Sequence, residues 1–344
     1  MRLQVNLLKD AIPEAVDQYF PRPARDAFHE ADTQRVLHGA EWYSVLITQG
    51  DNGFFHVFAP TAIRGTAWRD IDPFMGYFGP LVKAIDPQFL EAALAEYRNA
   101  CQSLGIVAEV MRFNPLLENH RPFEGRSELQ VGPVKSLVIA DCSPDEAAQL
   151  ARYNQTCRYD VRTAGAELKV GWLETEEEWQ SFAALYAESL RRVGAHAKWH
   201  LAAAVFERAR SVPAFRICAA RQDGQLASAS LIIEHPLQAY YLLAANSMPR
   251  VNGANELSIH RTCLALAERG IAHFILGGGN SASEDDPLLR FKRKFSRKGH
   301  TLHLGRMIHM KEAYERLCGE YEAKAGVEAR KDYFLRYRLL PEYE

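Results

Sequence analysis

The chain reads Ile275-Leu-Gly-Gly-Gly-Asn280 and, after an acidic loop, Asp285-Asp-Pro-Leu-Leu-Arg-Phe-Lys-Arg-Lys-Phe295. An apolar strand ends in three glycines, and a short helix with a dense basic face follows the loop. Backbone without Cβ atoms can come close to a ligand, and lysine or arginine beside it can hold a phosphate or a developing oxyanion. Since most glycine-rich loops are only turns, the interpretation depends on the neighbouring elements.

Residues 172–309 predict a definite order of elements around this stretch. The order is two helices, three strands in a meander, helix, strand, helix and strand. A capping box at Thr175-Glu-Glu-Glu178 opens the first helix. The strands are expected at 215–221, 226–234, 239–246, 272–276 and 301–308, and the later helices at 199–208, 255–269 and 287–294.

The first half of the chain repeats part of this order. Strands are expected at 41–48 and 53–58, and a helix opens at Asp86-Pro87. The layout of a helix, a Gly-Ile pair and a strand occurs twice. The pair is Gly105-Ile106 the first time and Gly270-Ile271 the second, 165 residues later. The repetition predicts two related domains in one chain.

A domain boundary is expected near Cys142-Ser-Pro-Asp-Glu146, where Ser143 and Glu146 form a capping box. The predicted domains are residues 1–142 and 143–309. A helical tail over 310–344 is expected to pack back on the N-terminal domain.

Composition limits the function classes. Of 344 residues, 47% are apolar and 24% are charged, as in an ordinary folded protein. The net charge of −2 excludes a globally basic nucleic-acid coat, so we expect no DNA partner. The six cysteines lack metal or C-x-x-C spacing, which favours reduced thiols in a cytoplasmic protein. We find no signal peptide and no bilayer-spanning run.

Several motifs resemble those of one family. The motifs are Gly76-Tyr-Phe-Gly-Pro-Leu81, Arg112-Phe-Asn-Pro-Leu116 with Asn119-His120, Arg158-Tyr-Asp-Val-Arg162, Leu276-Gly-Gly-Gly279 and Leu289-Arg-Phe-Lys292. Together with the element order, they resemble Fem-type (FemAB-like) aminoacyltransferases and the related BioF2-like acetyltransferase domain of the GNAT superfamily. The resemblance implies an α/β chain with mixed α+β sheets, built as tandem GNAT-like domains.

An acyl transfer to an amine needs a donor for the oxyanion, aligned substrates and removal of a proton. In the GNAT scheme, a main-chain N–H group is the hydrogen-bond donor to the oxyanion, at the point where two parallel strands splay. We place this group at Ala244 or Ala245. By resemblance, Lys292 stabilises the transition state or orients a substrate.

The donor is expected at two loops. The GNAT pyrophosphate loop R/Q-x-x-G-x-G/A is matched at two of its three key positions, and Asn255 replaces its small third residue. An alternative is an ordinary helix start with Asn255 as N-cap. The candidate donor-binding residues are Arg250, Gly253, Asn255, Gly277, Gly278, Gly279 and Lys294.

The acceptor is expected at the carboxyl ends of strands in the first half, where open α/β sheets commonly bind ligands. Arg112 could grip a diphosphate with two hydrogen bonds, and His120 could serve as base. The candidate acceptor-binding residues are Tyr77, Arg112, Asn114, Asn119 and His120.

We therefore expect an N-acyltransferase of bacterial envelope metabolism, without a permanent cofactor or metal. The co-substrate is acyl-CoA or aminoacyl-tRNA, and the acceptor is a nucleotide sugar or peptidoglycan precursor, with peripheral membrane contact left open. One alternative is an acyl-CoA-dependent acetyltransferase on a small amine or amino sugar. Another is a non-catalytic ligand-binding protein on the same fold.

Overall fold

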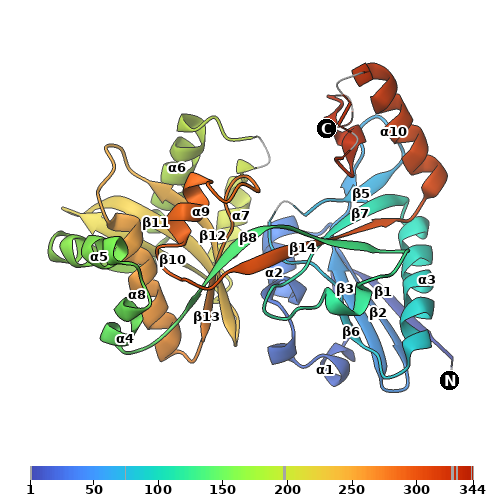
Figure 1. Cartoon of the computed structure of the whole chain (residues 1–344), viewed down its shortest axis with the longest axis horizontal. Coiled ribbons are helices and arrows are strands. Elements are labelled where there is room, and N and C mark those ends of the chain that lie inside the picture. The colour runs from blue at the N-terminus through green and yellow to red at the C-terminus, as the bar shows by residue number, and fades with distance from the viewer. Residues whose placement is uncertain are drawn as a thin grey trace. The chain divides into compact units, whose positions relative to one another are not determined.

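The computed structural model describes residues 2–73, 75–196, 199–326, 329–330, 332–341 and 343. The chain forms two compact units, residues 1–134 with 302–344 and residues 135–301 (Figure 1). The predicted boundaries at 142 and 309 are therefore misplaced. Strand β8 (Gln130–Asp141) and strand β14 (His300–Ile308) each begin in one unit and end in the other. Because strand periodicity continues across both crossings, the sequence pattern does not mark them.

The first unit contains two groups of strands. One antiparallel sheet has the order β1-β2-β3-β6, and the other group has the order β4-β5-β7-β14, with β5 parallel to β7. The bounds are β1 Gln4–Lys9, β2 Tyr43–Gln49, β3 Asn52–Phe58, β4 Thr61–Ala62, β5 Arg69–Ile71, β6 Leu81–Lys83 and β7 Ile106–Arg112.

Helix α3 covers the core of the first unit, where its Phe89, Leu90 and Tyr97 side chains are buried. Asp86 caps it by accepting a hydrogen bond from Gln88 N at 2.9 Å, as predicted. The described α-helices of this unit are α1 Val16–Tyr19, α2 Ala31–His38, α3 Pro87–Ser103 and α10 Lys311–Ala325.

The C-terminal segment is anchored in the first unit by one buried carboxylate. Asp70 accepts hydrogen bonds from Arg338 Nη2 at 2.6 Å, Arg338 Nε at 2.9 Å and Tyr337 Oη at 2.9 Å. Ile63, Val107 and Leu317 belong to the apolar cluster beneath α10.

The second unit is built on one mixed sheet with the order β8-β13-β12-β11-β10-β9. Only β12 and β13 form a parallel pair among the described strands of this sheet. The bounds are β9 Lys169–Leu173, β10 Phe215–Gln222, β11 Gln225–Glu234, β12 Gln238–Asn246 and β13 His273–Gly277. These agree with the predicted meander, whereas β9 is not among the elements that the sequence predicts.

Helices pack on this sheet, and α5 lies side by side with α8 (Figure 1). The described helices are α4 Glu146–Ala151, α5 Gln155–Glu167, α6 Glu176–Arg192, α7 Ala203–Arg210, α8 Ala254–Glu268 and α9 Pro287–Lys292. The capping box of Thr175 and Glu178 is confirmed at the start of α6. The box predicted at Ser143 is wrong, because Asp145 caps α4 by accepting from Ala148 N at 2.6 Å.

Candidate functional site

The parallel strands β12 and β13 separate in the second unit, as the resemblance to the GNAT superfamily implies. Their pairing ends where Tyr240 lies opposite Ile275. β12 continues to Asn246, still paired with β11 on its other side. After Tyr240, one edge of β12 therefore has no strand partner in the described part of the chain.

A bulge in β12 occurs at the same place. Tyr241 lies opposite Ile232 and Leu243 lies opposite Leu231, so Leu242 has no counterpart on β11. A bulge interrupts the ladder locally and leaves the extra residue unpaired. The main chain around Leu242 is therefore an additional candidate for oxyanion binding, which the sequence alone did not indicate.

The two predicted N–H donors face opposite sides of β12. Ser247 N donates to Ala227 O on β11 at 3.0 Å, and Asn246 N donates to Ser189 Oγ on α6 at 3.3 Å. Since successive N–H groups alternate along a strand, Ala245 N–H is directed at β11 and Ala244 N–H at the open edge. Ala244 stays a candidate, whereas the pairing of Ala245 with β11 does not favour Ala245.

Lys292, at the end of α9, reaches back to the triple glycine. Its Nζ donates a hydrogen bond to Gly278 O at 2.8 Å, and the residue is only 8% exposed. Burial, followed by the positive charge of Lys135, lowers the pKa of Lys292 to about 7, while Asp286 acts in the opposite sense. An amine with this pKa can both donate and accept a proton near neutral pH.

The three glycines are required by close packing and backbone shape. Gly277 has φ +79°, and a Cβ atom on it would lie 3.5 Å from Lys292 Nζ. A Cβ on Gly278 would lie 2.8 Å from Ser136 O. A Cβ on Gly279 would overlap the carboxyl group of Asp286. Protein atoms therefore fill the space beside Gly278 and Gly279, so their predicted donor-binding role is not favoured.

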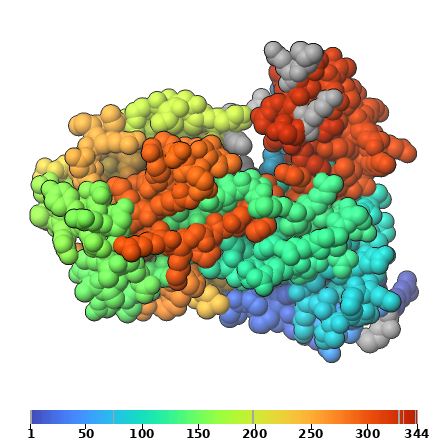
Figure 2. All heavy atoms as spheres, viewed as in Figure 1, coloured from blue at the N-terminus to red at the C-terminus, as the bar shows by residue number. Residues whose placement is uncertain are grey.

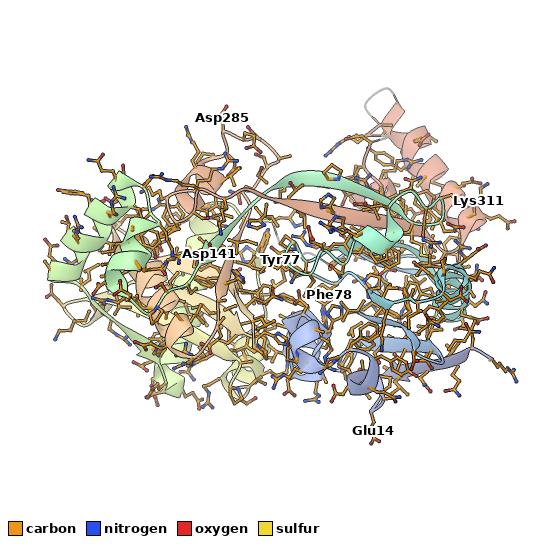
Figure 3. The ribbon with its side chains drawn as sticks, turned by 60° about the horizontal axis from the view of Figure 1, so that its bottom comes forward. Glu14, Tyr77, Phe78, Asp141, Asp285 and Lys311 are labelled. Atoms are coloured by element: carbon orange, nitrogen blue, oxygen red, sulfur yellow. The ribbon has the colours of Figure 1, made fainter. Side chains whose placement is uncertain are left out.

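Asp286 organises the loop between the glycines and α9. Its carboxylate accepts hydrogen bonds from Ser281 N at 2.9 Å, Leu288 N at 2.9 Å and Leu289 N at 3.1 Å. The backbone hydrogen bond from Ser281 is the largest cause that holds the pKa of Asp286 well below its usual range. The neighbouring Asp285 is exposed at the tip of the loop (Figure 3). Asp286 is thus the N-cap of α9.

The start of α8 is covered by α5. Gly253, with φ +73°, is the N-cap of α8, and a Cβ atom on it would lie 2.7 Å from Asp160 O. The alternative of Asn255 as N-cap is therefore wrong, since Asn255 lies within the first turn. Arg250 is exposed in the preceding loop. The predicted phosphate position at this helix start thus lies against another helix.

Lys294 belongs to an ion-pair cluster at this contact. Its Nζ lies 2.7 Å from Glu256 Oε1 on α8 and 3.1 Å from Asp160 Oδ2 on α5. Because two carboxylates already neutralise its charge, the arrangement does not favour the predicted role in phosphate binding.

In the first unit, the two predicted asparagines hold a turn. Asn114 Oδ1 accepts from Leu116 N at 2.7 Å, and Asn114 Nδ2 donates to Asp26. Asn119 Oδ1 accepts from Asn114 N at 2.9 Å, and Asn119 Nδ2 donates to Gly79 O at 2.9 Å. These bonds do not favour their predicted acceptor-binding role, because asparagine readily satisfies local backbone groups in turns.

Arg112 keeps part of its hydrogen-bonding capacity. Its Nε donates to Gly76 O at 2.9 Å, and neither Nη atom bonds to any described residue. Burial lowers the pKa of Arg112, but a guanidinium stays charged at neutral pH. Tyr77, labelled in Figure 3, is buried, and burial raises the pKa of its hydroxyl. Arg112 therefore remains a candidate for binding an anion.

His120 stacks on His303, which the sequence analysis did not single out. The ring centroids are 3.9 Å apart, and the ring planes differ by 6°. Burial and then the charge of His303 lower the pKa of His120. His120 Nδ1 is buried and has no hydrogen-bond partner in the described structure. The neutral form that a base requires is thus favoured for this ring.

Among the described residues, no group of three or more His, Cys, Asp or Glu side chains is placed to hold a metal ion. No described helix is both long enough and apolar enough to cross a membrane.

Residues 151–293 match the family of acetyltransferase (GNAT) domains. No curated protein is significantly similar to the chain. Among solved structures, FemX superposes with a TM-score of 0.64 at 13% identity, over 92% of this chain and 99% of FemX.

Two other solved structures share the fold. The C-terminal domain of a putative lysylphosphatidylglycerol synthetase from Agrobacterium fabrum has a TM-score of 0.56 at 16% identity, over 92% of this chain and 98% of that one. A tandem GNAT protein from the clavulanic acid biosynthesis pathway has a TM-score of 0.55 at 12% identity, over 90% of this chain and 99% of that one. Residues 151–293 therefore match the acetyltransferase (GNAT) domain family, and the chain as a whole shares its fold with FemX and with a tandem GNAT protein.

Proposed function

We propose that this protein is an N-acyltransferase that moves an acyl or aminoacyl group onto an amine of a cell-envelope precursor. The observation that carries the proposal is the buried Lys292 amine, bound to Gly278 O where β13 ends and β12 has lost its parallel neighbour. A carbonyl placed along the open edge of β12 would receive hydrogen bonds from main-chain N–H groups near Leu242 and Ala244.

The donor is proposed to be an aminoacyl-tRNA, with acyl-CoA as the alternative that the GNAT family makes available. A CoA pyrophosphate normally uses the main-chain amides at a helix start. At the start of α8, α5 lies against Gly253, and the Glu256 and Asp160 carboxylates lie nearby. A phosphate entering there would meet both steric and electrostatic resistance.

Exposed cations of the second unit support a polyanionic donor. Residues 280–300 form part of the visible surface of this unit (orange in Figure 2). Arg162 on α5, Arg290 on α9 and Arg297 after it are exposed, and their guanidinium groups form no ion pair with a described residue. Unpaired arginines of this kind bind phosphates with strong salt dependence.

The acceptor is proposed to be a nucleotide-linked sugar or another peptidoglycan precursor, or a lipid-linked molecule that carries an amine. The neighbouring structures named FemX and lysylphosphatidylglycerol synthetase motivate these two acceptor classes. Arg112, whose Nη atoms bond to no described residue, is the residue proposed to hold the anionic part of the acceptor.

The test is a transfer assay with the full-length protein. Charged tRNA and acyl-CoAs, each with a radiolabelled acyl group, are incubated with nucleotide sugars carrying peptides or with amine-bearing lipids. Transfer from charged tRNA supports the proposal as stated, whereas transfer only from acyl-CoA supports the alternative donor.

Lys292→Ala provides the control for the site. We expect a fall in transfer rate of about 100-fold or more. Lys298→Ala, which removes an exposed lysine near Asp141, should leave the rate unchanged. A protein that binds acceptor but transfers nothing from either donor would instead fit a non-catalytic binding protein.

A further inference from the structure

A second lysine accompanies Lys292 at the triple glycine. Lys135, on β8, donates a hydrogen bond from Nζ to Gly279 O at 2.8 Å, while Lys292 Nζ donates to Gly278 O at 2.8 Å. The two ammonium groups thus bind successive carbonyls of one turn. Neither the family match nor the sequence motifs assign a role to Lys135.

The two lysines differ in their contact with water. Lys292 is buried, whereas Lys135 is half-buried. When two cations lie close together, the more buried one loses its proton more readily, because water stabilises its charge less. Lys292 is therefore the member of the pair that changes its protonation state.

The other charged groups near Lys292 do not cancel this effect. Asp286, from the loop before α9, faces the amine, but its carboxylate already accepts hydrogen bonds from several donors of its own loop. Glu284 is paired with Arg293 and accepts a hydrogen bond from Ser136 Oγ at 2.6 Å. Lys135 is thus the neighbouring charge that opposes protonation of Lys292.

We propose that Lys135 is a positioning residue: bound to Gly279 O beside the Lys292 amine, it holds the turn and places a second positive charge there, so that Lys292 serves as the proton acceptor of the transfer. The second part rests on the proposed function. Burial and the charge of Lys135 are also the two causes that lower the pKa of Lys292.

The proton balance of the transfer is complete with this assignment. The neutral acceptor amine attacks the ester or thioester carbonyl, and a new C–N bond forms. The amine's surplus proton passes to the neutral Lys292 Nζ. When the tetrahedral intermediate collapses, the C–O or C–S bond breaks, and the Lys292 ammonium returns the proton to the leaving oxygen or sulfur.

The test measures the titration of Lys292 directly in the full-length protein. Lysine labelled with ¹³C at Cε is incorporated, and NMR follows the Cε signals from pH 5 to pH 11. The Lys292 signal is identified by its absence in Lys292→Met. We expect a midpoint near pH 7 in the natural protein and a rise of about one pH unit in Lys135→Met.

Two control variants separate charge from structure. Lys135→Arg keeps the charge and should keep the low midpoint, whereas Lys135→Met should not. Lys169→Met removes an exposed lysine of the same unit and should leave the midpoint unchanged. A Lys292 midpoint near its ordinary value in the natural protein, or a midpoint indifferent to Lys135→Met, overturns the proposal.

This experiment is independent of any substrate. If the titration behaves as expected but neither charged tRNA nor acyl-CoA supports transfer, the proposed function fails while the coupling of the two lysines stands. If transfer occurs and Lys292 titrates like an ordinary lysine, the proposed function stands and the role of Lys135 fails.

Discussion

The side chain of Asp286 fills the space that a side chain on Gly279 would need, since a Cβ atom on Gly279 would lie only 2.8 Å from Asp286 Cβ. Asp286 caps α9, and α9 ends in Lys292. The third glycine therefore makes room for the cap of α9 and, through this cap, affects the position of Lys292.

Gly279→Ala should displace Asp286 and loosen α9. Overpacking of this kind costs about 1–3 kcal/mol, and we expect transfer to fall together with the apparent melting temperature. Thermal unfolding and hydrogen exchange of peptides from α9 would measure both effects.

Gly299→Ala is the matched control, because a Cβ atom on Gly299 would meet no atom of the described structure within 4 Å. Equal exchange of α9 peptides in both variants would contradict the argument.

Lys292→Met should stabilise the protein while abolishing its activity. The pKa of Lys292 falls from 10.5 to about 7 on folding, mainly through burial. Between these values the unfolded chain binds more protons, so stability rises with pH through this window, and the full cost of the buried charge applies below pH 7. Methionine removes that cost, and we expect a gain of about 2 kcal/mol at pH 6.

Thermal unfolding at pH 6 and pH 10 would check the sign. The gain in stability from Lys292→Met should be larger at pH 6 than at pH 10. If the gain were the same at both pH values, the Lys292 amine would have the same pKa in the folded and the unfolded chain.

The order of elements in residues 172–309 was predictable because helix and strand periods differ and each helix start carries a signal. Thr175 with Glu178 is such a signal, and its box is present. Helix α5 lay outside this reasoning, since apolar spacing within Gln155–Glu167 is weak and α8 supplies the surface on which it packs.

The site was predictable in part, and the misses have one cause. A motif names residues but does not say whether a side chain faces a ligand or its own chain. Asn114 and Lys294 lie in motif-like stretches, yet their polar atoms are bound to a turn and to two carboxylates. Lys135, far from the glycines in sequence, carried no local signal that it would bond to Gly279 O.

Arg112→Gln should weaken acceptor binding without unfolding the first unit. The substitution removes a charged fork whose two Nη atoms make no hydrogen bond to the described residues. Loss of a charge-assisted pair would raise the acceptor KM or dissociation constant by about 10- to 100-fold. Calorimetric titration with a nucleotide-linked acceptor would measure it.

Arg121→Gln is the control for charge, because Arg121 is an exposed side chain of the same unit that pairs with Glu118 at 2.7 Å. Equal losses in both variants would show that total charge, and not the Arg112 position, attracts the acceptor.

Glu109 makes the first unit sensitive to acid. Its carboxylate is buried and lies 2.6 Å from His56 Nε2 and 2.6 Å from Tyr97 Oη. Burial alone would raise the pKa of Glu109, but the charge of His56, the nearby His309 ring at 3.4 Å and the hydrogen bond with His56 outweigh it and hold the pKa at about 2. The carboxylate therefore contributes stability above pH 4.5, and this contribution is lost as the pH falls toward 2.

Glu109→Gln breaks this buried pairing and should destabilise the first unit by about 3 kcal/mol at pH 7. The deficit should shrink below pH 4.5 and disappear near pH 2, where the natural carboxylate is protonated as well. Denaturant unfolding, with hydrogen exchange of β7 peptides to locate the effect, measures the deficit at each pH. Glu91→Gln, at an exposed position of α3, should show no loss of stability at pH 7 or near pH 2. A deficit of Glu109→Gln that stays constant from pH 7 to pH 2.5 would mean that the shape of the side chain, and not its charge, holds the cluster together.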